Sequence, residues 1–301
     1  SQAGYVVLLG KGVGRSFRAA RALRRFVSLH CIDVVHIHTE GNWLRTVLAV
    51  RWSIAGRPSA VVRTVHSNFL ATGKWLASRA LQAWLGDPFV RAIVAPSPDV
   101  VETERAIGRE CQLIFNWVDD RMTALRTRRR LQPLETQATR AVIVGNCSEV
   151  KRHELALQAI WQAGLELSHI GDETHANQAE RDLLNQFEES GRLVRRGIQL
   201  PDDALFDGDV YCMPSRVEGF GVAFAEALSA GLPSLVSDAP GLRWARMIGG
   251  VELLPDNVDA WQQALTTIRV DAPPDIPAGI DFHARRGAHE YSLLYRAVLA
   301  S

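Results

Sequence analysis

The sequence predicts an α/β protein built from two doubly wound domains in tandem. Short apolar segments of strand length alternate with longer segments of helical periodicity, which is typical of parallel βαβ units. The alternation stops in a polar segment, residues 128–140, and then begins again. The chain has 301 residues, enough for two domains of ordinary size. We therefore predict one domain over residues 1–127 and a second over residues 128–287.

The first half alternates strands with helices. The segment RSFRAARALRRFVSL, residues 15–29, places Phe17, Leu23 and Phe26 at helical spacing, and residues 100–108 form a shorter predicted helix. The predicted strands span residues 5–9, 33–38, 59–67, 91–97 and 112–119. Helices between successive strands predict parallel pairing, because a parallel pair needs a long crossover connection.

The second half repeats this alternation. Two predicted helices, residues 153–164 and 179–191, each end at a glycine, which is a helix stop signal. The predicted strands span residues 140–145, 165–172, 193–200, 209–215 and 233–238. Four apolar or aromatic side chains share one face of the final helix, residues 288–301: Tyr291, Leu294, Tyr295 and Val298. We expect this helix to pack back on the first domain.

Charge is distributed unevenly, although the net formal charge is only +1. Residues 1–130 contain 20 Lys and Arg against 9 Asp and Glu, whereas residues 131–301 contain 14 against 24. This asymmetry indicates two domains with different partners. The basic half favours an anionic membrane surface or a phosphorylated acceptor, and a solvated arginine-rich surface explains the same charges equally well.

The cysteines and the apolar segments indicate the cellular compartment in which the protein is found. Cys31, Cys111, Cys147 and Cys212 lie far apart and form no Cys-x-x-Cys pair, so we expect reduced thiols without metal or disulfide. No apolar run reaches the ~18–20 residues that span a bilayer, and no secretory signal pattern is visible. We expect a cytoplasmic protein, with contact at the inner face of the membrane through the basic half.

A strand, a glycine-rich loop and a helix follow one another over residues 209–235. The strand DVYCMPS is followed by Gly219 and Gly221, which disfavour helix. A helix then runs from Val222 to its stop at Gly231. The start of such a helix offers free N–H groups to an anion, and doubly wound sheets bind ligands at the carboxyl ends of their strands.

Two glutamates flank this helix start. Glu218 lies at the end of the strand, and Glu226 lies about one turn into the helix. A carboxylate next to a phosphate is unfavourable unless it accepts hydrogen bonds from hydroxyl groups, which sugars and riboses supply in pairs. The pair therefore indicates a nucleotide sugar, while the spacing alone is equally compatible with two solvated glutamates.

The segment SRVEGFGVAFAEALSAGLPSLVSD is similar to the E-x7-E segment of retaining GT-B glycosyltransferases of family 4, also called glycosyl transferases group 1. IFNWVDDRM, residues 114–122, resembles that family's P-N-G-V-D loop, with Phe115 and Trp117 in place of its Pro and Gly. VGNCSEVKRH, residues 144–153, resembles its G-R-x-x-x-x-K loop. The resemblance implies two Rossmann-like domains that face a cleft, the GT-B arrangement.

The resemblance also implies roles for residues of the second domain. Glu226 would bind the ribose hydroxyls of the donor nucleotide, and Glu218 would hold hydroxyls of the donor sugar close to the reacting carbon. Backbone N–H groups of Phe220, Gly221 and Val222 would meet the sugar and the pyrophosphate.

The loop before the second-domain helix supplies the remaining donor residues. Lys151 would neutralise the departing diphosphate, because a fixed cation stabilises charge that builds on the leaving oxygen. The resemblance also assigns Gly145, Asn146 and Arg152 to this donor-binding loop. The family has an arginine where Asn146 stands, and an amide carries no charge, so we expect Arg152 to compensate.

Two histidine segments, DVVHIH and TVHSNF, resemble those of the family's acceptor domain. The resemblance implies that His66 is catalytic and faces the donor sugar. The alternative is a core histidine whose hydrogen bonds are made within the protein. His36 and His38 share one face of a strand, but they lack a third ligand at a telling spacing, so no zinc site is predicted. We expect His38 and Asn42 on the acceptor side.

GKGVGR, residues 10–15, has neither the Walker spacing nor a complete G-x-G-x-x-G pattern. Either it serves as the N-terminal glycine-rich loop found in the family, or that loop and its strand are missing from this sequence. The short chain favours missing segments.

These observations predict a retaining glycosyltransferase that moves a hexose-type sugar from a nucleoside diphosphate to an acceptor hydroxyl, in glycolipid, polysaccharide or glycoconjugate biosynthesis. The resemblance implies metal-independent chemistry, so we expect no metal and no cofactor beyond the donor. A lipid-linked or phosphorylated acceptor is expected, and no nucleic acid. The alternatives are a nucleotide-sugar epimerase of the same two-domain plan and a non-catalytic nucleotide-sugar binding scaffold.

Overall fold

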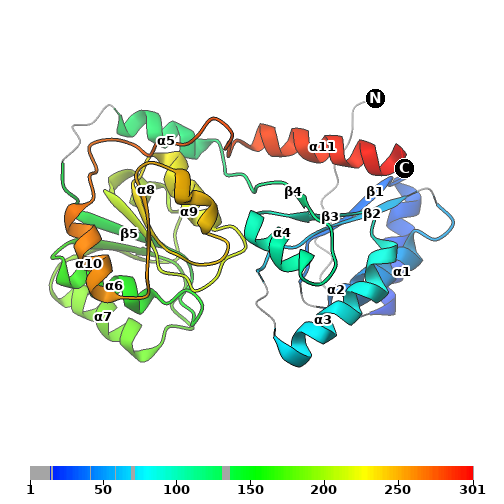
Figure 1. The fold of residues 1–301 in the computed structure, drawn as a ribbon, viewed down its shortest axis with the longest axis horizontal. Helices are drawn as coiled ribbons and strands as arrows, with labels where there is room; N and C mark the ends of the chain where they lie inside the picture. Colours follow the sequence, from blue (N-terminus) through cyan, green and yellow to red (C-terminus); the bar gives the residue numbers. More distant parts are fainter. Residues whose placement is uncertain are drawn as a thin grey trace. The chain divides into compact units, whose positions relative to one another are not determined.

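The computed structural model describes residues 14, 16–40, 42–57, 59–68, 72–130 and 136–300. Contacts divide the chain into two compact units. The first contains Ser1–Pro96, Val100–Ile114 and Glu290–Ser301, and the second contains Ser97–Asp99 and Phe115–His289 (Figure 1). Each unit is a parallel sheet with helices in its connections, so the predicted pair of doubly wound α/β domains is confirmed. The predicted strand 5–9 and all of the loop 10–15 except Gly14 lie outside the described residues.

The first unit has a parallel sheet in the order β1-β2-β3-β4. Its strands are β1 (Val34–Ile37), β2 (Ala60–Thr64), β3 (Ala92–Ala95) and β4 (Gln112–Leu113). Its helical segments are α1 (Phe17–Leu29), α2 (Trp43–Ser53), α3 (Gly73–Gly86), η1 (Asp87–Phe89) and most of α4 (Pro98–Arg105). The inner strand β2 is buried along its whole length, including the polar residues Arg63 and Thr64 that follow its apolar start.

The last helix, α11 (Ala284–Ala300), supplies its residues from Glu290 onward to the first unit. Tyr291, Leu294 and Val298 are buried in one apolar cluster with Val62 of β2 and Val94 of β3. The helical spacing of these side chains therefore places the apolar face of α11 against this sheet, although most of the chain between them belongs to the second unit.

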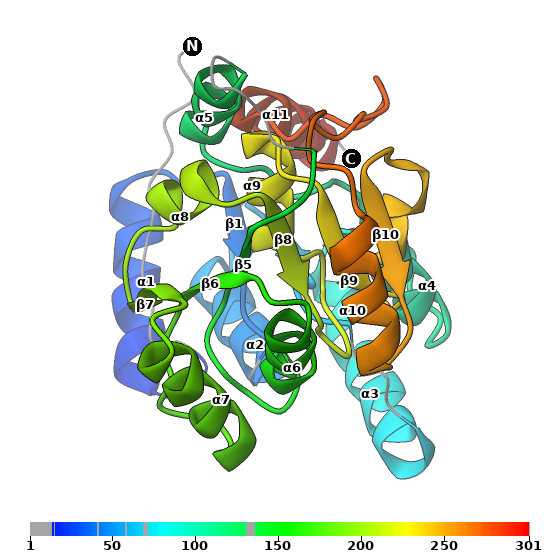
Figure 2. The ribbon, with the colours of Figure 1, turned by 90° about the vertical axis from the view of Figure 1, so that its left-hand side faces the viewer.

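The second unit has a six-stranded parallel sheet in the order β10-β9-β8-β5-β6-β7 (Figure 2). Its strands are β5 (Arg140–Val144), β6 (Glu166–Ile170), β7 (Leu193–Gly197), β8 (Val210–Met213), β9 (Ser234–Ser237) and β10 (Val251–Leu254). Its helical segments are α5 (Arg121–Arg129), α6 (His153–Gln162), α7 (Gln178–Glu189), α8 (Asp202–Asp207), α9 (Val222–Ala230), η2 (Arg243–Met247) and α10 (Val258–Thr267). The strand order reverses between β5 and β8, which makes this pair the topological switch point.

Both faces of this second sheet are covered. On one face, Ala141 and Ile143 of β5 pack with residues of α6, α7 and α10. On the other face, Val142 packs with residues of α5, α8 and α9. Successive strand side chains point to opposite faces, so the apolar run in β5 serves two separate cores.

The boundary between the units lies at Ile114 and Phe115, whereas the sequence pattern predicted it at residue 127. Residues of α5 belong to the second unit, because Met122 and Leu125 are buried in the same core as Phe224 of α9. The many arginines of this segment obscured its apolar stripe in the sequence. Among the described helices, none combines the length and apolarity needed to cross a bilayer.

Candidate functional site

The predicted donor residues gather where the strand order of the second unit reverses. The loop after β5 carries residues 145–152, and the loop after β8 carries residues 214–221. Both loops leave the carboxyl ends of adjacent parallel strands, so they meet at the same edge of the sheet. Doubly wound sheets bind their ligands at such an edge.

The loop after β8 opens helix α9 without a side-chain cap. Gly221 is the N-cap and adopts a left-handed conformation, with φ of 80°, which favours glycine. The first N–H groups of α9 therefore have no capping side chain and remain available to an anion. Gly241 packs against this loop so closely that a Cβ at this position would lie 1.9 Å from the carbonyl oxygen of Glu218. Glu218 itself donates its backbone N–H to the Pro240 carbonyl at 2.9 Å.

Glu218 is paired with Lys151. Lys151 Nζ lies 2.5 Å from Glu218 Oε1, and the two side chains are 30% and 12% exposed. Lys151 ends the turn before α6, and Glu218 lies in the loop before α9. The structure therefore brings together the two residues predicted to act on the sugar and on the leaving diphosphate.

Glu226 lies on α9 and is partly buried. Burial raises the pKa of its carboxyl, the Arg121 guanidinium lowers it, and Asp202 and Asp119 raise it further. Glu218 and Glu226 also act on one common group, because burial and then both of these carboxylates raise the pKa of Tyr211. The two predicted hydroxyl receptors are therefore both within electrostatic range of this buried tyrosine of β8.

The Arg152 side chain is buried and fully engaged with protein groups. It donates to the Pro214 carbonyl at 2.9 and 3.1 Å and to Ser237 Oγ at 3.3 Å, and it pairs with Asp256. These contacts hold the end of β8 just before the Glu218 loop. The geometry therefore favours Arg152 as a residue that positions this loop, and the expectation that it compensates for the charge missing at Asn146 stays a prediction.

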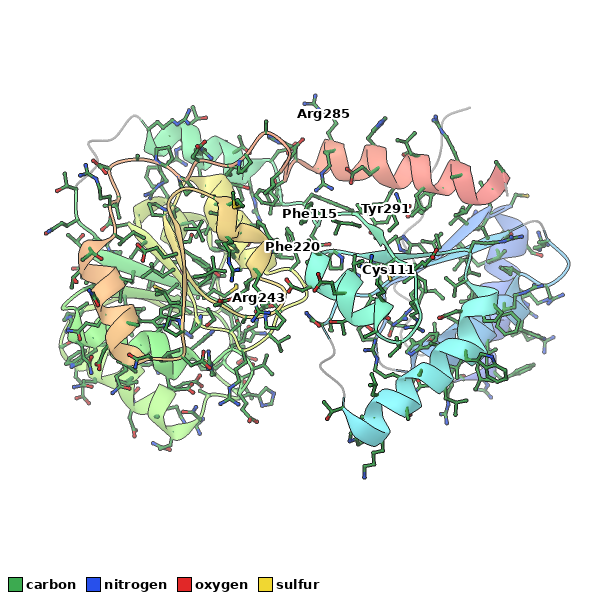
Figure 3. All side chains as sticks on the ribbon, viewed as in Figure 1. Cys111, Phe115, Phe220, Arg243, Arg285 and Tyr291 are labelled. Atoms are coloured by element: carbon green, nitrogen blue, oxygen red, sulfur yellow. The ribbon has the colours of Figure 1, made fainter. Side chains whose placement is uncertain are left out.

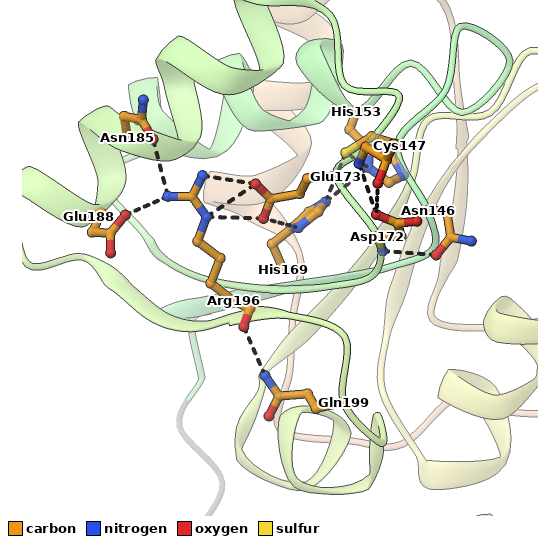
Figure 4. A network of polar contacts seen from close by, with 11 residues as sticks. Asn146, Cys147, His153, His169, Asp172, Glu173, Asn185, Glu188, Arg196 and Gln199 are labelled. Carbon is orange, nitrogen blue, oxygen red and sulfur yellow. Dashed lines mark hydrogen bonds and ion pairs between the residues drawn. The ribbon is translucent and has the colours of Figure 1, made fainter.

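The loop after β5 begins at Gly145 and Asn146. Gly145 donates its N–H to the Ile170 carbonyl at 2.8 Å, and Asn146 Oδ1 accepts the backbone N–H of Asp172 at 2.9 Å (Figure 4). Both contacts join this loop to the end of the neighbouring strand β6. Asn146 therefore links its own loop to the segment after β6 through its side chain, a contact that needs no positive charge.

Phe220 is a core residue of the second unit, with only 2% of its surface exposed. Its ring stacks on Trp244, with ring centroids 4.9 Å apart, and approaches Phe115 with centroids 5.8 Å apart (Figure 3). Trp244 Nε1 donates to the Phe220 carbonyl at 3.0 Å. This packing fixes the backbone of the glycine-rich loop just before Gly221 and Val222.

The predicted histidines lie at the carboxyl ends of β1 and β2 in the first unit. His38 Nδ1 lies 2.8 Å from His66 Nε2, and His66 donates its backbone N–H to Glu40. Burial and then Arg63 lower the pKa of His66. Burial and then His66 lower the pKa of His38 to about 4. Both rings are therefore neutral near pH 7.

Asn42, also predicted on the acceptor side, is the N-cap of α2 and has a left-handed backbone with φ of 57°. Its carbonyl accepts the backbone N–H of Thr46 at 3.0 Å. The roles assigned to His66, His38 and Asn42 toward substrates stay predictions, as do those of the donor residues.

An Asp-x-Asp triplet, Asp207-Gly208-Asp209, precedes β8. Asp209 Oδ2 accepts the backbone N–H groups of Thr139 and Arg140, and Asp207 pairs with Arg195. These carboxylates lie at the amino end of β8, at the edge of the sheet opposite to Glu218. Their contacts there stabilise the fold.

Two family models match the sequence. Residues 2–121 match Glycosyltransferase Family 4, and residues 138–271 match Glycosyl transferases group 1, so together the matches cover most of the chain. The chain belongs to glycosyltransferase family 4. No curated protein sequence matches it significantly.

Solved structures support the same fold for this glycosyltransferase family member. Sucrose-phosphate synthase from Thermosynechococcus elongatus is 15% identical with a TM-score of 0.71, and the match covers 99% of this chain and 82% of that one. Anabaena Alr3699/HepE, solved with UDP and glucose, is 15% identical with a TM-score of 0.61, over 83% and 71% of the two chains. A putative UDP-N-acetylglucosamine 2-epimerase from Listeria monocytogenes is 14% identical with a TM-score of 0.54, over 82% and 68%. At these identities the likeness shows the GT-B fold alone.

One group of this glycosyltransferase was missed in the sequence. Cys147, His153 and His169 are buried together behind the donor loop (Figure 4). Burial and then His169 lower the pKa of His153 to about 3, and burial lowers the pKa of His169 to about 4. The spacing Cys147-x5-His153 was a signal, but His169 joins the group only because β5 and β6 are neighbours in the sheet.

Proposed function

We propose that the protein is a retaining glycosyltransferase that moves a hexose-type sugar from a nucleoside diphosphate to an acceptor hydroxyl, with no metal ion in the chemical step. The observation that carries this proposal is the contact between Lys151 and Glu218 beside the uncapped start of α9. It joins a cation, a hydroxyl receptor and an anion-binding helix start at one edge of the sheet.

In this proposal each group meets one part of the donor. Glu226 accepts hydrogen bonds from the ribose hydroxyls, and Glu218 accepts them from the sugar. The N–H groups of Phe220, Gly221 and Val222 bind the pyrophosphate, and Gly145 and Asn146 border it from the neighbouring loop. Anabaena Alr3699/HepE, which shares the fold, was solved in complex with UDP, and this supports a nucleotide donor.

The transfer step follows from these positions. The bond between the anomeric carbon and the diphosphate oxygen breaks while the acceptor oxygen attacks on the same face. Lys151 stabilises the negative charge that develops on the leaving diphosphate. The leaving phosphate oxygen accepts the acceptor's proton, and His66 contributes as a neutral group toward the sugar. Turnover therefore needs no carboxylate as general base.

The acceptor is proposed to be lipid-linked or phosphorylated, and the protein to be cytoplasmic with contact at the inner face of the membrane. Helix α1 supports this, because Phe17 and Leu29 are 70% and 79% exposed beside Arg21, Arg24 and Arg25. Apolar and basic side chains on one helix suit an anionic lipid surface. Co-sedimentation with anionic vesicles but not with neutral vesicles is the expected result.

The donor assignment is tested by thermal shift with UDP-, GDP- and ADP-sugars on the wild type and on Glu226→Ala. At least one donor should raise the melting temperature of the wild type, and Glu226→Ala should reduce this rise. If no nucleotide sugar stabilises the wild type at millimolar concentration, the donor assignment fails.

The fold match to a putative 2-epimerase makes epimerisation the second candidate. The two activities differ in their requirement for an acceptor. Incubation of the best-binding donor without any acceptor should leave it unchanged if the protein is a transferase. Interconversion of the donor sugar under these conditions, followed by NMR, would instead identify an epimerase.

A further inference from the structure

Three donor atoms from different segments converge within the second unit. Cys147 Sγ comes from the loop after β5, His153 Nδ1 from the first residue of α6, and His169 Nε2 from β6. The residues are 1%, 2% and 0% exposed. Within the described part of the chain, this is the one group of three such side chains whose donor atoms all lie within 4.8 Å of one another.

The separations match those around a single zinc ion. Zinc binds thiolate sulfur at about 2.3 Å and imidazole nitrogen at about 2.0–2.1 Å, so a tetrahedral ion separates two nitrogens by about 3.3 Å and a nitrogen from a sulfur by about 3.6 Å. Here Cys147 Sγ lies 3.6 Å from His153 Nδ1 and 3.6 Å from His169 Nε2, and the two nitrogens lie 3.1 Å apart. We propose that Cys147, His153 and His169 bind a zinc ion.

The surroundings have the features of an outer coordination shell. His169 Nδ1 is buried without a hydrogen-bond partner, and Glu173 Oε1 lies 3.7 Å from it. Arg196 holds the Glu173 carboxylate through contacts of 2.8 and 3.0 Å (Figure 4). A histidine that binds a metal usually presents its other nitrogen to a carboxylate, which orients the ring and strengthens the ligand.

Charges of both signs lie near the cluster. Glu173 follows β6 and Glu180 lies on α7, and Glu180 accepts the backbone N–H of His153 at 3.0 Å. Lys151 and Arg196 are the cations that act on the two rings. A thiolate and two neutral imidazoles add one negative charge, which a divalent ion more than balances. Thiolate together with imidazole is a ligand set that suits zinc better than it suits magnesium or calcium.

The ion would have a structural role distinct from sugar transfer. It would tie the loop that carries Lys151 to β6 and to the start of α6, and so hold this loop at the carboxyl edge of the sheet. The cysteine spacing predicted thiols without metal, and a zinc ion at Cys147 departs from that expectation. Metal binding is measured without a sugar donor, so its outcome does not depend on the proposed transferase activity.

The alternative is a cluster held by hydrogen bonds alone, and a pair of substitutions separates the two. Cys147→Ser keeps a hydroxyl that can hydrogen-bond to both rings but removes the soft sulfur ligand. His169→Phe keeps an aromatic ring in this buried position but removes the nitrogen ligand. Zinc binding therefore predicts an ion in the wild type and its loss in both variants, whereas a hydrogen-bonded cluster binds zinc in none of the three proteins.

The test measures zinc by mass spectrometry in tag-free protein after dialysis, together with cobalt(II) spectra of the chelator-treated protein. One zinc per chain is expected in the wild type, with a thiolate-to-cobalt absorption band. Chelation should lower the melting temperature, and added zinc should restore it. His175→Gln, an exposed histidine of the following loop, and Cys212→Ser, a buried cysteine of β8, are the matched controls and should keep the ion.

Three results would overturn the proposal: wild type that takes up no zinc and shows no cobalt band, zinc retained at full occupancy by Cys147→Ser, or copper in place of zinc. If Cys147→Ser does not fold, the cobalt band of the wild type still reports thiolate ligation directly. A wild type that binds cobalt without that band would refute the role of Cys147.

Discussion

Lys151 Nζ and Glu218 Oε1 lie 2.5 Å apart and join the loop before α6 to the loop before α9. The loops follow β5 and β8, the two strands between which the order of the sheet reverses. A second ion pair, Arg216 with Glu149 at 3.7 Å, joins the same loops but is far more exposed. Substitutions in the two pairs can therefore distinguish a role of Lys151 in the proposed chemistry from a role in tethering the two loops.

Lys151→Ala should lower turnover by ~10²–10³-fold, because it removes the fixed cation that faces the leaving diphosphate. Its effect on the free energy of unfolding should stay within about 1 kcal/mol, since partly exposed ion pairs contribute little. Turnover and urea unfolding measure the two effects. Arg216→Ala is the control and should leave turnover and the free energy of unfolding unchanged. An equal loss of turnover in this control would show that Lys151 acts by tethering the two loops.

Glu226→Gln should weaken nucleotide binding and stabilise the free protein at pH 7. Loss of charge-assisted hydrogen bonds to the ribose costs about 1.5–3 kcal/mol, roughly 10- to 100-fold in Kd. The pKa of Glu226 is raised, so the folded state holds its proton more tightly than the unfolded state does, and stability is lost as pH rises through that raised pKa. Glutamine carries no charge and removes this loss.

Calorimetric titration and thermal unfolding at pH 7 measure the two effects of Glu226→Gln. Glu252→Gln is the control, because burial also raises the pKa of Glu252, which lies on β10. This control should leave nucleotide affinity unchanged. Unchanged affinity in Glu226→Gln would show that Glu226 does not bind the ribose.

Arg152→Ala should destabilise the second unit by about 1–3 kcal/mol, because the buried Pro214 carbonyl loses its donors. Asp256→Asn should cost less than about 1 kcal/mol, since the Asp256 side chain is 66% exposed and its pairing is screened by water. Urea unfolding of both variants gives the comparison. A larger loss of stability in Asp256→Asn would show that Arg152 stabilises the protein through its ion pair with Asp256 and not through the Pro214 carbonyl.

His36 should make the first unit sensitive to acid. Burial, followed by His38 and His66, lowers the pKa of His36 from 6.5 to about 3. A lowered pKa means that the unfolded state binds the proton more readily, so this contribution is complete above pH 6.5 and is lost as pH falls toward 3. His36→Gln should therefore reduce the fall in melting temperature between about pH 7 and about pH 5. The exposed His289→Gln should show the wild-type fall, and identical slopes for all three proteins would contradict the prediction.

Local patterns in the chain were sufficient to predict the fold class and the outline of the donor site. Alternating apolar strands and amphipathic helices predicted two parallel sheets, because burial on both faces favours continuous apolar runs such as residues 141–144 of β5. The pair Gly219 and Gly221 between a strand and a helix identified an anion-binding helix start, since both the backbone conformation and the uncapped N–H groups are local properties. Glu218 and Glu226 were singled out by the same local pattern, whereas Lys151 and the roles of all three residues came from the family resemblance.

Which of these residues touch one another follows from the strand order and not from any local pattern. The ends of β5, β6 and β8 meet at one edge of the sheet because these strands are neighbours. That order brings Lys151 into contact with Glu218 and allows Arg152 to donate a hydrogen bond to the Pro214 carbonyl. It also brings His169 to Cys147 and His153, which the sequence left unconnected. Contacts between residues far apart in the chain depend on sheet topology, and topology is set by packing of the whole core.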